Sequence, residues 1–135
     1  MKRDYIVKQN DISDCGVCSL LSIIKYYKGF IPLEKLRLDT KTTRNGTTAY
    51  NLIETAIKYG FNAYGKKVEE LNDDLILPAI AHLTYENGLN HFVVVYKIND
   101  HFVYLMDPAK GYIRVELNKF KKIWTNVILV FKPYR

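Results

Sequence analysis

Cysteine is scarce in this 135-residue sequence, with two residues at Cys15 and Cys18. Two thiols so close together provide no disulfide framework of the kind that stabilises small secreted proteins, and they suit a reducing compartment. Long apolar stretches are also missing, because the longest, Phe92 to Tyr96 and Val127 to Phe131, have the length of strands rather than of a membrane span. The N-terminus lacks the apolar segment of a secretory signal. We therefore expect a soluble cytosolic chain.

Concentrated charge of one sign is absent as well. The net charge of +6 comes from Lys and Arg scattered along the chain, with no block of five like charges. Such a surplus is typical of a solvated surface and can steer acidic peptides or lie near an anionic membrane. Because no motif interleaves basic and aromatic residues, we expect no specific binding of nucleic acid. The length fits one domain spanning residues 1–135.

Apolar periodicity divides the chain into a helical first half and a second half of strands. Helical spacing predicts helices over residues 15–28, 32–38 and 49–59, the first and last closed by Gly29 and Gly60. Alternating and β-branched stretches predict strands over residues 62–68, 78–84, 91–98, 101–107, 112–117 and 127–131. Short helices are expected at residues 69–74 and around Trp124. Helices first and a meandering antiparallel sheet second predict an α+β fold.

Cys15 is predicted to stand at the first turn of the first helix. The unpaired amides and the dipole of a helix N-terminus favour the thiolate, which is the nucleophilic form of cysteine. Gly16 removes a side chain beside the sulfur, so a substrate backbone could approach closely. Gln9 lies six residues upstream and could direct its amide to an oxyanion. The alternative is an inert buried cysteine beside an ordinary surface glutamine.

A thiolate needs a base, and the sequence offers three histidines. His91 opens one predicted strand and Asp107 closes the next. His101 has the position of a loop residue, and His82 that of a satisfied sheet histidine, although His82 stays open as the alternative base. A carboxylate beside His91 would hold its imidazole in one tautomer for a thiol.

The turn between these strands decides whether the two side chains meet. A three-residue loop over residues 98–100 pairs Val95 with Val103 and His91 with Asp107 on one face. A two-residue loop would place His91 and Asp107 on opposite faces. In that case Asp107 would only start a turn and His91 would be a polar residue at a strand end.

Four separated motifs agree in order and spacing with a known family. They are Gln9 followed after four residues by Asp14-Cys15-Gly16, Leu77-Pro78-Ala79-Ile80-Ala81-His82, Asn90-His91-Phe92-Val93-Val94, and Asp107-Pro108. Together they resemble the peptidase domain of bacteriocin-processing ATP-binding cassette transporters over nearly the whole chain. The resemblance implies a papain-like cysteine peptidase with Cys15 as nucleophile, His91 as base, Asp107 as its orienting partner and Gln9 as oxyanion donor.

The resemblance also implies a substrate and partners. The substrate would be a peptide precursor whose leader ends in Gly-Gly and is removed after the second Gly before export. The partners would be transmembrane and nucleotide-binding domains of the transporter, which place the chain at the cytosolic face of the cell membrane. No cofactor and no metal is expected.

Two other functional classes compete with the peptidase. Cys15-Gly16-Val17-Cys18 is also a Cys-x-x-Cys sequence at a helix start, as in thiol-disulfide oxidoreductases, although the preceding residues are polar rather than a buried strand. A docking module that binds leader peptides without cutting them is the second alternative. A zinc site is not expected, because the two thiols lack a second pair of closely spaced ligands.

Overall fold

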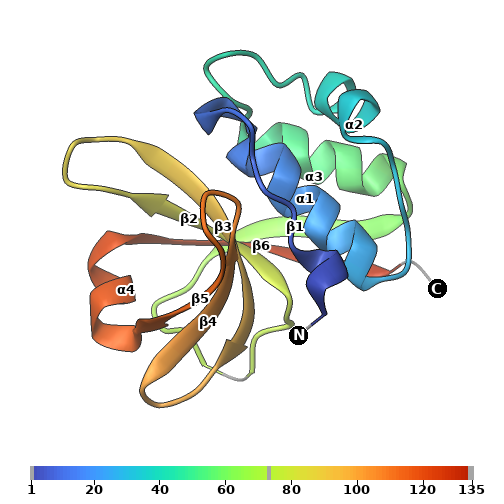
Figure 1. Ribbon diagram of the computed structural model, residues 1–135. Helices are drawn as coiled ribbons and strands as arrows, with labels where there is room; N and C mark the ends of the chain where they lie inside the picture. Colours follow the sequence, from blue (N-terminus) through green and yellow to red (C-terminus); the bar gives the residue numbers. More distant parts are fainter. Residues whose placement is uncertain (1, 73, 134–135) are drawn as a thin grey trace.

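The computed structural model describes residues 2–72 and 74–133, which form a group of helices beside a six-stranded antiparallel sheet (Figure 1). The predicted α+β class is confirmed. The helices are the 3-10 turns η1 (Arg3–Tyr5) and η2 (Ile12–Asp14) and the α-helices α1 (Cys15–Tyr26), α2 (Leu33–Asp39), α3 (Ala49–Lys58) and α4 (Leu117–Ile123). The strands are β1 (Phe61–Lys67), β2 (Ala79–Thr84), β3 (Asn90–Ile98), β4 (Phe102–Asp107), β5 (Gly111–Glu116) and β6 (Trp124–Pro133).

The first three α-helices begin and end within two residues of the predicted bounds. The Thr48 hydroxyl accepts the Asn51 N–H at 3.1 Å and caps α3, and Gly60 follows the helix with a φ of 100° that favours glycine. The chain leaves α1 through a bond of 2.9 Å from the Gly29 N–H to the Ile24 carbonyl. No helix of the described residues is long and apolar enough to cross a membrane.

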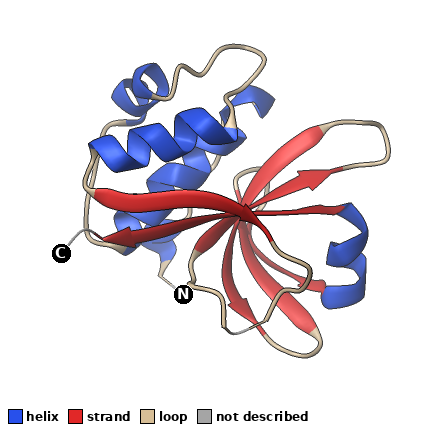
Figure 2. Cartoon of the chain, turned by 180° about the vertical axis from the view of Figure 1, so that it is seen from behind, coloured by secondary structure: helices blue, strands red, loops and turns tan. Residues whose placement is uncertain are grey.

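The sheet has the strand order β1-β6-β2-β3-β4-β5. The meander predicted from the sequence is therefore only partly right, because β6 returns to lie between β1 and β2. Sequence spacing carries no signal for this insertion, which depends on pairing between distant strands. Seen from behind, the strand that ends at the C-terminus runs beside a second strand, and the helical group lies above both (Figure 2).

Alternation along the strands buries side chains on both faces of the sheet. On one face Val94, Met106 and Leu129 pack with the apolar residues of α1 and α3. On the other face Val95 and Leu105 belong to a second cluster that includes Phe120 of α4. The helices α1 and α3 thus cover one face and α4 covers the opposite one, which leaves the N-terminus of α1 beside the sheet (Figure 1).

Two predicted short helices are placed wrongly. The described residues of segment 69–74 form no helix, because Leu71 is buried in the second cluster and the Asn72 side chain accepts the Asp74 N–H in a local turn. Asp73 lies outside the described residues. The helix expected around Trp124 ends at Ile123, since Trp124 is buried and pairs with Leu83 as part of β6.

Candidate active site

Cys15 is the first residue of α1, as predicted, and its side chain is buried. The next residue has no room for a side chain, because a Cβ on Gly16 would lie 2.8 Å from Thr47 Cγ2 and 3.3 Å from the Phe92 ring. Glycine is therefore required here for close packing between α1, the segment before α3 and strand β3. The close approach predicted at Gly16 is made by the protein's own side chains.

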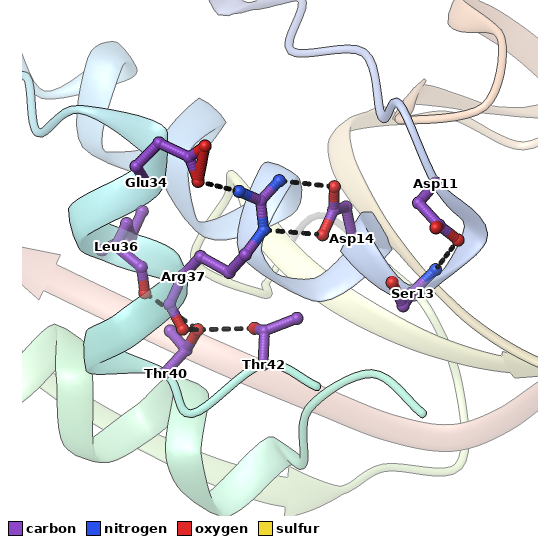
Figure 3. Close-up of polar contacts among 8 residues, drawn as sticks. All are labelled: Asp11, Ser13, Asp14, Glu34, Leu36, Arg37, Thr40 and Thr42. Carbon is purple, nitrogen blue, oxygen red and sulfur yellow. Dashed lines mark hydrogen bonds and ion pairs between the residues drawn. The ribbon is translucent and has the colours of Figure 1, made fainter. Parts of the chain in front are cut away.

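An ion pair fixes the residue that precedes the thiol. The Arg37 guanidinium, from α2, donates to both carboxylate oxygens of Asp14, with Nη2–Oδ2 at 2.7 Å and Nε–Oδ1 at 3.1 Å (Figure 3). Arg37 also pairs with Glu34 on its own helix. The Asp14 side chain is 4% exposed, and its hydrogen bonds raise the pKa of Arg37. This bidentate pair ties α2 to the start of α1.

His91 and Asp107 form a buried pair at the ends of their strands. His91 Nε2 lies 2.7 Å from Asp107 Oδ1, and the Ala109 N–H donates to the same oxygen at 2.8 Å. Burial raises the pKa of Asp107, but the bonds from His91 and Ala109 outweigh it and lower the pKa below its usual value. The carboxylate is therefore ionised at neutral pH.

The pKa of His91 is raised to about 9. Burial disfavours the charged ring and lowers the pKa, but hydrogen bonds with Asp107 and with Cys15, and the charges of both groups, reverse this effect. Since Nε2 is occupied by Asp107, Nδ1 is the nitrogen left for the thiol. An imidazole held between a carboxylate and a thiol can exchange a proton with the sulfur.

The predicted strand register was wrong, although the two side chains do meet. Val95 lies opposite Leu105, not opposite Val103, and the turn occupies residues 99–101. Continued to the strand end, the observed register leaves Asp107 diagonal to His91 on the same face, a separation that these side chains can bridge. The histidine and carboxylate therefore meet for a different geometric reason from the one expected.

Gln9 lies next to the turn that carries Asp107. Its backbone N–H donates to the Pro108 carbonyl at 2.9 Å, which fixes the N-terminal segment beside the β4–β5 turn. The buried Oε1 of Gln9 has no hydrogen-bond partner among the described residues. A buried amide without an internal partner is costly unless a ligand or water satisfies it.

Tyr85 covers the histidine. The two rings lie 6.0 Å apart between centroids, and the pKa of Tyr85 is raised by burial and then by the charges of Asp107 and Cys15. Sequence reasoning missed Tyr85 and Arg37. A buried aspartate such as Asp14 demands a cation, but nothing near it in the sequence identifies Arg37 as that partner.

Cys15 opens onto a cleft of about 600 Å³ between the helical half and the sheet. The segment from Arg44 to Ala49 lines one wall, and His82, Phe92 and Val127 line the other. His101 does not line this cleft. No group of three or more His, Cys, Asp or Glu side chains within residues 2–72 and 74–133 could hold a metal ion.

Cys18 is unlike Cys15. Its side chain is fully buried in the core that α1 forms with the sheet, and burial, followed by the charge of Asp14, raises its pKa to about 12. The thiol of Cys18 is therefore protonated at neutral pH. The second sulfur of a dithiol oxidoreductase needs only to reach the first sulfur, so this burial does not decide against the redox alternative. The His91–Asp107 pair next to Cys15 favours the peptidase instead.

Known proteins resemble this chain in sequence and in fold. Residues 3–135 match the Peptidase C39 family. This chain belongs to the peptidase C39 family. Over 95% of its length it is 39% identical to the lactococcin-G-processing and transport ATP-binding protein LagD of Lactococcus lactis. Over 98% of its length it is 36% identical to the transport/processing ATP-binding protein ComA of Streptococcus pneumoniae.

The C39 chain spans 19% of the length of each of these two transport proteins. An uncharacterised protein of Methanothermobacter marburgensis is 32% identical over 94% of the chain, which covers 87% of that protein. The family therefore includes proteins of about this size as well as much longer ones.

Solved structures confirm the papain-like C39 fold. A double glycine motif protease from an AMS/PCAT transporter, in complex with the leader peptide, superposes with a TM-score of 0.88 at 34% identity, covering 95% of this chain and 90% of that one. The peptidase domain of Streptococcus ComA, a bifunctional transporter in a quorum sensing pathway, gives a TM-score of 0.88 at 31% identity, covering 94% and 96%.

Proposed function

We propose that this chain is a cysteine endopeptidase that removes leader peptides after a Gly-Gly pair, with Cys15 as its nucleophile. The observation that carries the proposal is the buried His91–Asp107 pair, 2.7 Å apart, beside a thiol that opens onto a cleft. A thiol, an imidazole and a carboxylate in this order form the arrangement of a thiol peptidase. Membership of the C39 family supports it independently.

The first half of the reaction forms a thioester. The Cys15 thiolate adds to the carbonyl carbon of the second glycine, and the carbonyl electrons move onto oxygen. The side-chain NH2 group of Gln9 is the proposed donor to this oxyanion. Protonated His91 then gives its proton to the leaving nitrogen as the C–N bond breaks, and the cargo peptide leaves with a free amine.

The second half releases the leader. Neutral His91 accepts a proton from water while the water oxygen attacks the thioester carbon. The C–S bond then breaks, the leader leaves with a free carboxyl group, and the Cys15 thiolate and protonated His91 of the starting state are restored. Asp107 stays ionised throughout and holds His91 Nε2, so that Nδ1 faces the sulfur. The role proposed for Asp107 is thus to orient and stabilise the imidazolium.

The proposed biological setting follows from the relatives. LagD and ComA are named as processing and transport ATP-binding proteins, and the similar protease structure contains a bound leader peptide. By analogy, this chain would work with transmembrane and nucleotide-binding domains of a transporter, at the cytoplasmic face of the membrane, and cut a precursor of a bacteriocin or related peptide before export.

Mass spectrometry of peptide cleavage tests the proposal. The probes are synthetic peptides with an amphipathic leader ending in Gly-Gly and a short cargo, together with matched peptides in which Val replaces the second Gly. Wild type and the control Cys18→Ala should release the cargo from the Gly-Gly peptides, and Cys15→Ala should release none. Equal cleavage by Cys15→Ala, or intact Gly-Gly peptides with the wild type, would contradict the proposal.

A further inference from the structure

His82 occupies the sheet wall of the cleft and has no role in the reaction proposed above. Its strand β2 pairs with β3 so that His82 lies opposite Phe92, with ring centroids 5.2 Å apart. Both rings line the cleft that Cys15 also lines, and His82 is half-buried there. A polar ring on the wall of a peptide-binding cleft is placed to contact the peptide.

Hydrogen bonding to Thr125 fixes which nitrogen of His82 carries the proton. The Thr125 hydroxyl donates to the His82 backbone carbonyl at 3.1 Å, and the same oxygen lies 3.0 Å from His82 Nδ1. A hydroxyl has one hydrogen, so the contact with the ring must run from Nδ1–H to the oxygen. The lone pair of the neutral imidazole is then on Nε2.

Burial lowers the pKa of His82, so the ring is neutral at pH 7 and Nε2 is an acceptor there. Within residues 2–72 and 74–133, the ring forms its hydrogen bond through Nδ1, and Nε2 is not among the buried atoms that lack a partner. Nε2 is therefore accessible, on a side chain that lines the cleft. This separates His82 from His91, whose ring is charged at neutral pH and contacts a carboxylate.

We propose that His82 Nε2 accepts a hydrogen bond from a backbone N–H of the last residues of the leader peptide. The inference rests on the proposed function, because it assigns a leader-binding contact to the same cleft. An extended peptide turns alternate N–H groups toward one wall, and each must find an acceptor when the cleft excludes water. Glycine residues let the backbone approach the wall without a side chain between them.

This hydrogen bond would form with the bound substrate and persist through the reaction. His82 is thus proposed as a substrate-binding residue whose loss raises KM and leaves kcat nearly unchanged. One net hydrogen bond corresponds to a change of about 3- to 10-fold in affinity. If His82 only supported the fold, its replacement would not abolish the contribution of one particular backbone N–H of the peptide to binding.

The test replaces single backbone N–H groups by ester oxygens at each of the last three leader residues, leaving the scissile amide intact. Affinities are measured by calorimetry in the Cys15→Ala background, with His82 present, changed to Leu, or changed to Gln. With His82 present, one ester should weaken binding about 3- to 10-fold. His82→Leu should weaken binding of the all-amide peptide by the same factor and remove the effect of that ester.

His82→Gln should restore part of the affinity, because its carbonyl oxygen can reach the position of Nε2. A Thr125→Val variant keeps the imidazole but removes the hydroxyl that fixes the proton on Nδ1, so either ring nitrogen can carry it. This variant should weaken binding no more than His82→Leu does. The ester peptides are also measured with the protein that retains His82, so a folding defect in one variant cannot hide the outcome.

The inference is overturned if no ester weakens binding, or if the losses from the ester and from His82→Leu multiply. Either result can occur while wild type still cleaves the all-amide peptide, and then only the role of His82 fails. If wild type failed to cleave the peptide while the esters and the His82 variants showed the expected binding losses, the proposed peptidase function would be rejected instead.

Discussion

Replacing Asp107 by Asn tests how the proposed base is held. The pKa of His91 lies at about 9 against an ordinary 6.5. At about 1.4 kcal/mol for each pH unit, the protonated ring is stabilised by about 3 kcal/mol in total. Burial opposes this stabilisation, so it comes from Asp107 and Cys15. Asparagine keeps an oxygen for Nε2 but removes the charge, and we expect the pKa of His91 to fall by about 1–2.

A lower pKa of His91 should change the pH at which activity declines on the alkaline side. The active form carries a thiolate and a protonated His91, so activity is lost as pH rises through the pKa of that histidine. In wild type this loss should be centred near pH 9. In Asp107→Asn it should begin about 1–2 pH units lower, together with a fall in kcat/KM of at least about 10-fold at the optimum.

The assay is the pH dependence of kcat/KM with a fluorogenic leader peptide. Asp100→Asn makes the same carboxylate-to-carboxamide change at an exposed position in the β3–β4 turn. It serves as the matched control and should keep the wild-type profile. An unchanged alkaline limit in Asp107→Asn would refute the idea that the carboxylate supports the imidazolium.

Two further substitutions test the contacts that hold the start of α1 in place around Cys15. Arg37→Ala leaves the buried Asp14 carboxylate without its bidentate partner, and we expect the free energy of unfolding in urea to fall by about 3 kcal/mol. Gly16→Ala places a methyl group 2.8 Å from Thr47 Cγ2, and we expect a loss of about 1–3 kcal/mol, measured in the same way.

For each of these two variants, a second substitution tests the cause of the loss of stability. Adding Asp14→Asn to Arg37→Ala removes the stranded charge and should recover part of the stability, so equal stability of the single and double variants would contradict the argument. Adding Thr47→Ser to Gly16→Ala removes the clashing methyl group and keeps the hydroxyl that donates to the Thr40 carbonyl. A double variant no more stable than Gly16→Ala would show that the contact is not the cause.

Local signals in the sequence were sufficient for the first three α-helices and for the position of the thiol. The period of the apolar residues, a Thr48 cap and a positive-φ glycine at position 60 mark the ends of α3 without reference to the rest of the chain. The same holds for Cys15 at the start of α1. These features depend on residues a few positions apart, where backbone geometry dictates the contacts.

Features that depend on distant segments were not predictable in this way. The insertion of β6 between β1 and β2 and the pairing of Arg37 with Asp14 join segments that no spacing rule connects. The register of β3 with β4 was mispredicted because the turn lies at residues 99–101 and not at 98–100, and the register also shifts by one residue between Val95 and Lys97. His91 and Asp107 nevertheless meet, since a diagonal contact tolerates the change.

The central claim, that His91 activates the Cys15 sulfur and not that of Cys18, is tested most directly by covalent trapping. A leader peptide ending in a Gly-Gly chloromethyl ketone is incubated with the protein, and the modified residue is located by peptide mass mapping. We predict one adduct, on Cys15, formed far more slowly in His91→Ala. An adduct on Cys18, or labelling of Cys15 at the same rate without His91, would contradict the account.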